Sequence, residues 1–465
     1  MYSVVHGNRK QATDVQEFIS LLDNLSAHPL AQGLFDPAPD LIVSRAPGRL
    51  DVMGGIADYS GSHVLELPIA EATFAAVQLN EQCQLNIVTL LDEEPYHSSF
   101  TMPLSVFDGP IDYEKAREFF QLEDAGGWAS YVAGVFLVLM REQQANFASG
   151  ANILISSRVP LGKGVSSSAA LEVAVMEAVA AAYDIKVEAR EKALLCQKVE
   201  NMVVGAPCGV MDQMTAVFGE RDRLLLMLCQ PAELKGTIAV PSQLRLWGID
   251  SGIRHSVGGA DYGSVRAGAF MGARMIADLK TDFSKYLASI SPAEFESEYL
   301  AQLPKRVSGT AFLERYRGTM DPVTTVDPHK DYAIRLPTAH PIYENARVQR
   351  FVELLKKGGA FEELGELMYE SHQSYTALGL NSGGTDLLVE LVRKAGPAAG
   401  LFGAKITGGG SGGSVAVLGN ETSATAVEGV ASAYAKETGH QPYIFNGSSD
   451  GSQSFGTLRL SLSHR

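Results

Sequence analysis

The sequence predicts a mixed α+β fold built from two domains, and three observations support this prediction. The chain has 465 residues, more than a single hydrophobic core usually serves. Hydrophobic residues make up 46% of it and charged residues 20%, a balance typical of folded globular proteins. Runs rich in β-branched residues alternate with apolar runs at helical spacing, so both strands and helices are expected along the whole chain.

The first half of the chain predicts a helical lead-in followed by alternating strands and helices. Apolar residues at helical spacing predict helices at 15–25, 128–141, 169–183 and 188–203. Clusters of Val, Ile, Leu and Thr predict strands at 41–46, 73–79, 84–91 and 151–157. The apolar runs RLLLMLCQ and RLWGID follow, and a change in composition after them predicts a boundary between domains 1–245 and 246–465.

The second half predicts three helices and a pair of strands near the C-terminus. The helical stretches are 264–279, 345–355 and 385–395. The segment 281–329 is polar and mixed, and we interpret it as a surface insertion. The runs GAKITG and GGSVAVLG predict two strands that flank the glycine-rich segment 405–413.

Charge and cysteine content exclude several classes of function. The formal net charge is −15, which argues against nucleic acid or an anionic membrane as partner. The four cysteines form no CxxC pair and no zinc-binding spacing, so reduced thiols are expected. The first residues contain no apolar core of signal-peptide length. These features predict a soluble enzyme in the cytoplasm.

The segment RVPLGKGVSSSAALE is the most informative stretch of the chain. Gly162 and Gly164 form a turn, and three serines then lead into a long apolar helix. Free backbone N–H groups and the helix dipole favour an anion at such a position. The segment therefore predicts a loop for a nucleotide phosphate and its magnesium ion, although an ordinary serine-capped helix after a glycine turn has the same pattern.

Two further glycine-rich segments make the phosphate-loop interpretation more specific. They are APGRLDVMGGIADY at 46–59 and KITGGGSGG at 405–413. In order and spacing the three segments resemble the motifs of the GHMP kinases, and the resemblance runs from about residue 40 to about residue 450. It is closest to the galactokinase-like sugar-1-kinases, and the stretches 197–214 and 247–272 are most similar to L-arabinokinases.

The resemblance implies a GHMP kinase fold with nucleotide and sugar held between two halves. The N-terminal half would be an α/β unit of the ribosomal protein S5 domain 2-like type, and the C-terminal half ferredoxin-like. It also implies ATP and Mg²⁺ as cofactors.

The resemblance implies the following roles for polar residues. Ser168 and Glu200 would bind magnesium, for which hard oxygen ligands are suited. Asp212 would orient the sugar C1 hydroxyl or accept its proton, and Arg49 would keep Asp212 ionised and stabilise charge. From the residues alone, Glu200 could be a solvated helix carboxylate, and Asp212 a capping residue with Arg49 on the surface.

Further positions would contact ATP. In the phosphate loop these are Gly162, Gly164, Val165, Ser166, Ser167, Ser168 and Ala169. Trp128 and Tyr131 match an aromatic pair near the adenine, although both could equally be core residues. Gly409 and Gly410 belong to the third motif, which supports the phosphate loop in this family. The third motif also fits GxGxxG, but it lies between two predicted strands near the C-terminus, so we reject a dinucleotide site.

The first motif departs from galactokinase in a way that predicts the sugar. Galactokinases have Glu-His where this chain has Gly55 and Ile56, and those two side chains contact the C6 hydroxyl of galactose. Asp58 and Tyr262 match residues that bind the sugar ring. L-arabinopyranose is galactopyranose without its C6 group, so the pocket suits L-arabinose. The predicted sugar positions also include Gly209 and Asp51, which stands where an asparagine is expected.

Alternatives of the same fold stay open. The chain could be a galactokinase or a galacturonokinase, or a non-catalytic sensor that binds sugar and ATP. Beyond the small-molecule sugar and ATP, the expected state is a monomer or weak homo-oligomer.

Overall fold

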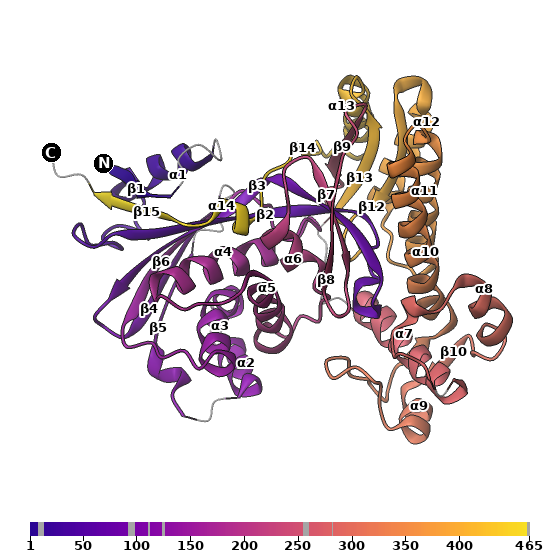
Figure 1. Ribbon diagram of the computed structural model, residues 1–465, viewed down its shortest axis with the longest axis horizontal. Coiled ribbons are helices and arrows are strands. Elements are labelled where there is room, and N and C mark those ends of the chain that lie inside the picture. Colours follow the sequence, from indigo (N-terminus) through magenta and orange to yellow (C-terminus); the bar gives the residue numbers. More distant parts are fainter. Residues whose placement is uncertain are drawn as a thin grey trace.

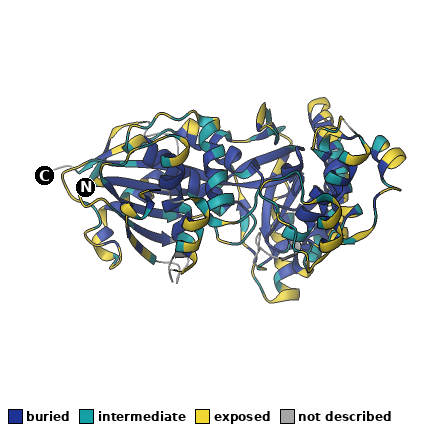
Figure 2. Ribbon diagram, turned by 90° about the horizontal axis from the view of Figure 1, so that it is seen from below, coloured by how far each residue is buried: buried dark blue, intermediate teal, exposed yellow. Residues whose placement is uncertain are grey.

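The computed structural model describes residues 1–7, 14–91, 98–109, 112–122, 126–253, 260–280 and 282–462. The chain forms two main sheets, and each is covered by its own set of helices (Figure 1). Figure 2 shows buried residues in both halves, along the sheets and the helix faces turned toward them. Residues 254–259, inside one segment that carries the family resemblance, lie outside the described residues.

The larger sheet has nine strands in the order β1-β15-β2-β3-β6-β4-β5, with β7 paired to β3 and β8 paired to β7. All neighbours are antiparallel except β4 and β6, which are parallel. The strands are β1 (Tyr2–His6), β2 (Leu41–Met53), β3 (His63–Asn80), β4 (Gln84–Leu91), β5 (Ser98–Pro103), β6 (Gly150–Ser157), β7 (Arg223–Leu228), β8 (Glu233–Ala239) and β15 (Leu458–Leu462).

Helices cover both faces of this sheet. The helices of this half are α1 (Asp14–Asp23), α2 (Tyr113–Leu122), α3 (Gly126–Glu142), α4 (Ser167–Ala182), α5 (Ala189–Lys198), α6 (Met211–Phe218) and α14 (Ser452–Phe455). Helix α4 has apolar residues on every side, interrupted by Glu172 and Glu177, and it is buried against β2 and β3 because its neighbours α3 and α6 cover its outer face. On the opposite face α1 packs through Phe18, whose ring stacks on Phe74 at 4.7 Å.

The second sheet has the ferredoxin-like arrangement that the resemblance implies. Its four antiparallel strands are β9 (Leu244–Asp250), β12 (Leu401–Ile406), β13 (Ser414–Asn420) and β14 (Ile444–Asn446), in the order β12-β13-β9-β14. Along the chain they form a β-helix-β-β-helix-β unit. Its main helices, α10 (Arg335–Lys357), α11 (Phe361–Ala377), α12 (Gly383–Ala395) and α13 (Ala424–Thr438), pack on and beside this sheet (Figure 1).

A third group of elements sits at the end of α10 and contributes α7 (Ala260–Leu279), α8 (Pro292–Glu294), α9 (Gly309–Tyr316), β10 (Arg306–Ser308) and β11 (Asp331–Ala333). Most described residues of the segment 281–329 are exposed or half-buried, as its interpretation as a surface insertion predicts, but a minority are buried. Phe295 and Phe312 are fully buried, in one core cluster with Tyr59 and Tyr262. Its buried aromatic residues thus complete a core that it shares with the first motif, α7 and α11.

The predicted strands and helices are otherwise present, with longer bounds for β2, β3 and α10. The helix predicted at 188–203 ends in a π-helical turn at Val199–Val204. Among the helices of eight or more residues, α2, α6, α9, α11 and α13 were missed. The division of the chain near residue 245 stays a prediction; β9 begins at Leu244, and the last strand, β15, pairs with β2 of the first sheet. None of the helices in the described ranges is long and apolar enough to cross a membrane.

Candidate active site

A pocket of about 240 Å³ receives residues from both halves of the chain. It contains most of the predicted site residues. The described residues that line it are Arg49, Ile56, Asp58, Tyr131, Gly162, Gly164, Ser166, Ser167, Ser168, Glu200, Ala206, Cys208, Gly209, Met211, Asp212, Tyr262 and Gly409.

The predicted phosphate loop forms one wall of this pocket. Gly162 and Gly164 both have φ of 70°, a left-handed conformation that glycine adopts without strain. The loop ends at Ser166, whose φ is 61°, and α4 begins at the next residue. The Ser166 hydroxyl is buried and has no hydrogen-bond partner within the described residues. A buried hydroxyl at a helix N-terminus is well suited to bind an anionic ligand.

The third glycine motif packs directly on this loop. A Cβ atom on Gly408 would lie 2.9 Å from the Gly164 carbonyl oxygen, and one on Gly413 would lie 2.8 Å from the Lys163 carbonyl oxygen. Glycine is therefore required at both positions, because two backbone segments meet without room for a side chain. Gly409 lies between them and reaches the pocket.

Arg49 and Asp212 meet inside the pocket. Arg49 lies on β2, and its Nε and Nη2 atoms are 2.8 and 2.7 Å from Asp212 Oδ1. Its Nη1 donates to the Gly164 carbonyl at 2.7 Å, and its Nε lies 3.2 Å from Glu66 Oε2. Asp212 stands in the first turn of α6 and keeps part of its surface exposed to the pocket. The arginine thus joins the phosphate loop to the carboxylate that was predicted to be catalytic.

Glu200 lies in the π-helical turn at the other side of the pocket, close to the start of α4. The Ser168 side chain hydrogen-bonds its carboxylate, and Gln213 Nε2 donates to Glu200 Oε2 at 2.8 Å. Burial, and then the negative charge of Asp212, raise the pKa of Glu200 to about 7. The charge of Asp212 opposes ionisation of Glu200, and a cation close to Glu200 would favour its charged form.

The sugar end of the pocket contains Ile56, Asp58, Gly209 and Tyr262. Ile56 has φ of 51°, which is strained for a β-branched residue, and its side chain is buried. A Cβ atom on Gly209 would lie 1.6 Å from Asp58 Oδ2, so the carboxylate packs directly on that glycine. Burial, and then the charge of Asp212, raise the pKa of Asp58 to about 6.

Two residues predicted to contact the sugar lie behind the pocket wall. Asp51 is fully buried and pairs with Lys405, Oδ2 to Nζ at 2.6 Å. A Cβ atom on Gly55 would point at the same group, 2.1 Å from Asp51 Oδ2 and 2.0 Å from the Tyr375 hydroxyl. Neither residue lines the pocket. Contact of Asp51 and Gly55 with the sugar stays a prediction, and in the structure both residues shape the wall that carries Ile56.

Four of the predicted ATP-binding residues also lie outside the pocket lining. Val165 and Ala169 are buried in the core, although the Val165 carbonyl accepts from the Arg49 N–H at 3.1 Å. Gly410 packs on Leu380. Trp128 is partly buried against the core of the first half, whereas Tyr131, one turn further along α3, does reach the pocket.

Sequence reasoning missed several residues that support the site. Glu66 pairs with Arg49, and Gln213 bridges Glu200 and Glu172, with distances of 2.8 and 3.3 Å from its Nε2. A signal for Glu66 was available, since a lone carboxylate in the apolar run HVLELPIA of a central strand needs a cationic partner. Nothing in the sequence indicates the role of Gln213.

Three family models match the chain. They are the GHMP kinases N terminal domain at residues 130–220, the GHMP kinases C terminal domain at 351–437 and the galactokinase galactose-binding signature at 32–79. The first contains the phosphate loop, Glu200 and Asp212, and the third contains Arg49, Ile56 and Asp58.

Individual relatives agree with these matches. The chain is 46% identical to L-arabinokinase from Arabidopsis thaliana over 92% of its own length, and it spans 48%, about half, of that protein. It is 30% identical to galactokinase from Chloroflexus aggregans, over 82% of this chain and 84% of that one. The structure of Lactococcus lactis galactokinase complexed with galactose is similar to it, with a TM-score of 0.73 at 20% identity, covering 94% of this chain and 99% of the other.

Proposed function

The chain belongs to the GHMP kinases, in the branch that contains the galactokinases, and from this premise we propose that it transfers the terminal phosphoryl group of ATP to the C1 hydroxyl of L-arabinose. The product would be L-arabinose 1-phosphate. The observation that carries the proposal is the contact between Arg49 and Asp212 at 2.7 Å, opposite the phosphate loop and beside Ile56 and Asp58.

Asp212 would act on the sugar hydroxyl. Its carboxylate is in the first turn of α6, where the helix dipole favours negative charge, and Arg49 pairs with it on one side. The exposed part of the carboxylate faces the pocket and can accept a proton from the C1 hydroxyl or orient that hydroxyl for attack. Arg49 pairs with the carboxylate, orients it and would stabilise negative charge that develops during transfer.

The phosphate loop would bind the ATP phosphates. Ser166, Ser167 and Ser168 line the pocket, and the unpartnered Ser166 hydroxyl and the N–H groups of the first turn of α4 would be the donors to the phosphates. Tyr131 is the aromatic residue of α3 that lines the pocket, so we assign the contact with adenine to it before Trp128.

Magnesium fits the oxygen atoms that line the pocket. The Ser168 hydroxyl and the Glu200 carboxylate are adjacent, and burial together with the charge of Asp212 raises the pKa of Glu200. A divalent cation would offset that charge repulsion, and two protein ligands are enough for an ion that keeps several waters. When bound, the ion neutralises charge on the transferring phosphoryl group.

L-arabinose fits the sugar end of the pocket better than galactose does. In the galactokinases that the first motif resembles, Glu and His at the positions of Gly55 and Ile56 contact the C6 hydroxyl. Here Ile56 presents an apolar side chain, and the space beyond Gly55 is filled by Asp51 and Tyr375. A C6 hydroxyl would be buried without a partner, which discriminates strongly against galactose.

A uronic acid is disfavoured by charge. Arg49 is the one cationic side chain among the described residues that line the pocket, and it already pairs with Asp212 and Glu66. A galacturonate carboxylate would therefore enter a pocket whose net charge is negative. Galactose remains the second candidate, because the chain is 30% identical to a galactokinase.

The test is an assay of ADP release from MgATP with L-arabinose, D-galactose and D-galacturonate as acceptors. The proposal predicts the highest kcat/KM for L-arabinose, with the product identified as the 1-phosphate by phosphorus NMR. A preference for galactose or galacturonate would contradict the assignment of the sugar while leaving the phosphoryl-transfer chemistry in place. Absence of turnover with all three, together with measurable ATP binding, would indicate a sensor.

A further inference from the structure

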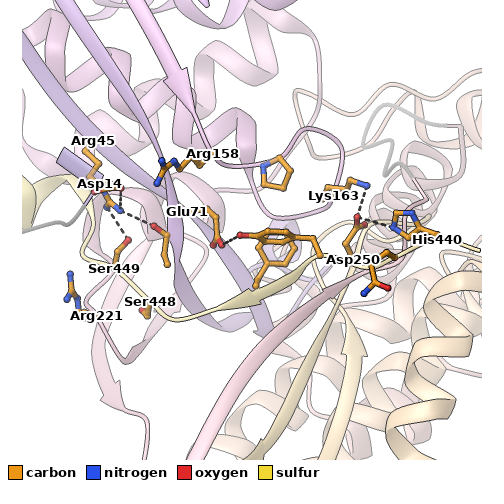
Figure 3. A pocket seen from close by; sticks show the side chains of 15 residues that line it. Asp14, Arg45, Glu71, Arg158, Lys163, Arg221, Asp250, His440, Ser448 and Ser449 are labelled. Carbon is orange, nitrogen blue, oxygen red and sulfur yellow. Dashed lines mark hydrogen bonds and ion pairs between the residues drawn. The ribbon is translucent and has the colours of Figure 1, made fainter. Parts of the chain in front are cut away.

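A second and larger cavity, of about 670 Å³, is lined by residues of both halves of the chain, among them Lys163 of the phosphate loop (Figure 3). The loop contributes Gly162 and Gly164 to the candidate active site, but Pro160 and Lys163 to this second cavity. The side chain of Lys163 therefore points away from the pocket in which the ATP phosphates are expected. A lysine in a phosphate loop would ordinarily be expected to contact the phosphates, and Lys163 does not point toward them.

Lys163 is held by the C-terminal half. Its Nζ lies 2.7 Å from Asp250 Oδ2, and the two side chains are 17% and 5% exposed. His440 Nε2 lies 3.7 Å from the same oxygen, as Figure 3 shows. The other oxygen, Asp250 Oδ1, accepts from the Gly252 N–H at 2.9 Å, and the Asp250 N–H donates to the Tyr443 carbonyl at 3.0 Å. Asp250 is therefore held in place by contacts that do not involve Lys163.

The same end of β9 also holds the third glycine motif. Asp250 is the last residue of β9, and the next residue, Ser251, donates from both its hydroxyl and its N–H to the Gly413 carbonyl, at 2.6 and 3.0 Å. Gly413 in turn packs on the Lys163 backbone. One short segment of the C-terminal half thus fixes Lys163 through its side chain and supports its backbone.

We propose that Lys163 is a positioning residue for nucleotide binding, which acts by anchoring the phosphate loop to Asp250. The inference rests on the proposed function, in which this loop binds ATP. Two glycines flank Lys163, so the loop has considerable conformational freedom unless it is anchored. Anchoring removes freedom that would otherwise be lost when the nucleotide binds, and so increases affinity.

The test measures binding of a magnesium complex of a non-hydrolysable ATP analogue by calorimetry, without sugar. Lys163→Met should raise Kd about tenfold, because a small displacement of the loop weakens several phosphate contacts at once. Lys163→Arg should stay close to wild type, because it keeps the charge and the reach. In turnover assays, KM for ATP should rise in the Met variant while KM for the sugar stays unchanged. An equal rise in both constants would indicate a structural role and overturn the proposal.

Asp250→Asn separates anchoring from direct phosphate contact. If Lys163 anchors the loop through Asp250, Asp250→Asn raises Kd for the nucleotide. The double variant Lys163→Met with Asp250→Asn should then have a Kd no higher than that of the single variant that binds more weakly. If Lys163 instead turns to the phosphates when ATP binds, Asp250→Asn releases it and leaves binding unchanged or tighter, which would overturn the proposal.

Lys192→Met is the matched control, since Lys192 pairs with Glu177 at 2.6 Å with side chains 18% and 8% exposed, away from the loop. It should leave Kd unchanged. Wild-type protein that binds no nucleotide would overturn the proposed function together with this inference. Wild-type protein that binds nucleotide, with an unchanged Kd in Lys163→Met, would overturn the inference alone.

Discussion

Asp51 Oδ2 and Lys405 Nζ lie 2.6 Å apart, and neither side chain has any exposed surface. The pair joins β2 of the first sheet to β12 of the second, directly behind the wall of the candidate active site. The Asp51 N–H donates to Thr407 Oγ1 at 2.7 Å, and the Gly408 N–H lies 3.3 Å from the Asp51 carboxylate. The first and third glycine motifs are therefore parts of one buried polar network, and its integrity should set both stability and pocket shape.

Removing one member of this pair should be costly. Lys405→Met leaves the Asp51 carboxylate buried without its cation, so we expect a loss of about 3–5 kcal/mol in the free energy of unfolding. Urea denaturation monitored by circular dichroism measures this. The double variant Asp51→Asn with Lys405→Met removes both charges and should recover part of the loss. Lys186→Met, at an exposed pair with Asp184, should leave stability close to that of the wild type. Equal losses of stability in Lys405→Met and Lys186→Met would contradict the expectation that the loss depends on burial of the pair.

Gly55→Ala tests the wall behind Ile56. The added methyl group would lie 2.1 Å from Asp51 Oδ2 and 2.0 Å from the Tyr375 hydroxyl, so one of these buried groups must move. We expect a loss of about 1–3 kcal/mol in stability, and a higher KM for the sugar because Ile56 is displaced. Gly429→Ala in α13 is the control: its Cβ would have nothing within 4 Å, so stability should stay equal or rise. A neutral Gly55→Ala would show that the wall is not rigid.

Asp58 should reduce stability above about pH 6. Burial, and then the charge of Asp212, raise its pKa to about 6 from the ordinary 3.8. A raised pKa means that the folded state binds the proton more tightly than the unfolded state, so the charged form costs stability at higher pH. Asp58→Asn should therefore stabilise the fold at pH 8, by an amount on the order of 2 kcal/mol. The gain should shrink as pH falls through 6 and vanish near pH 4, while sugar binding is weakened throughout. Unfolding free energies of both proteins at several pH values measure it, and a difference independent of pH would contradict the assignment.

How far the sequence predicts this site depends on how far apart its residues lie in the chain. The phosphate loop, Arg49 and Asp212 stand in contiguous motifs, and the structure brings their side chains together in the pocket. The partners that hold them are different, because Asp51 and Lys405 are 354 positions apart and Lys163 meets Asp250 only through the packing of two sheets. Local patterns carry no information on such pairs. The surroundings of Gly55 could not be predicted for the same reason, since they depend on Tyr375 of α11, a helix that was missed.

Asp212→Asn should abolish turnover while nucleotide binding persists. The amide has nearly the same shape but cannot accept the proton of the C1 hydroxyl, so we expect kcat to fall by about 10³-fold or more. Arg49 keeps Glu66 as an ionic partner, at 3.2 Å, and the fold should be preserved. Single-turnover kinetics measure the chemical step, and calorimetry with the ATP analogue verifies that Kd is unchanged. Turnover near the wild-type rate would show that Asp212 is not the base.

Ile56→Ala should loosen the discrimination against galactose. Shortening this side chain opens space at the position where the C6 group of galactose would lie, so the ratio of kcat/KM for galactose to that for L-arabinose should rise by about tenfold. Alanine also relieves part of the strain of a β-branched residue at φ of 51°, which offsets some of the lost packing.

Ile290→Ala is the matched control, because Ile290 is buried in the same core cluster but does not line the pocket. It should lower stability by about 2–4 kcal/mol and leave the ratio unchanged. If both variants shift the ratio equally, loosening of the core rather than the contact with the sugar controls specificity; if Ile56→Ala leaves the ratio unchanged, Ile56 does not select the sugar.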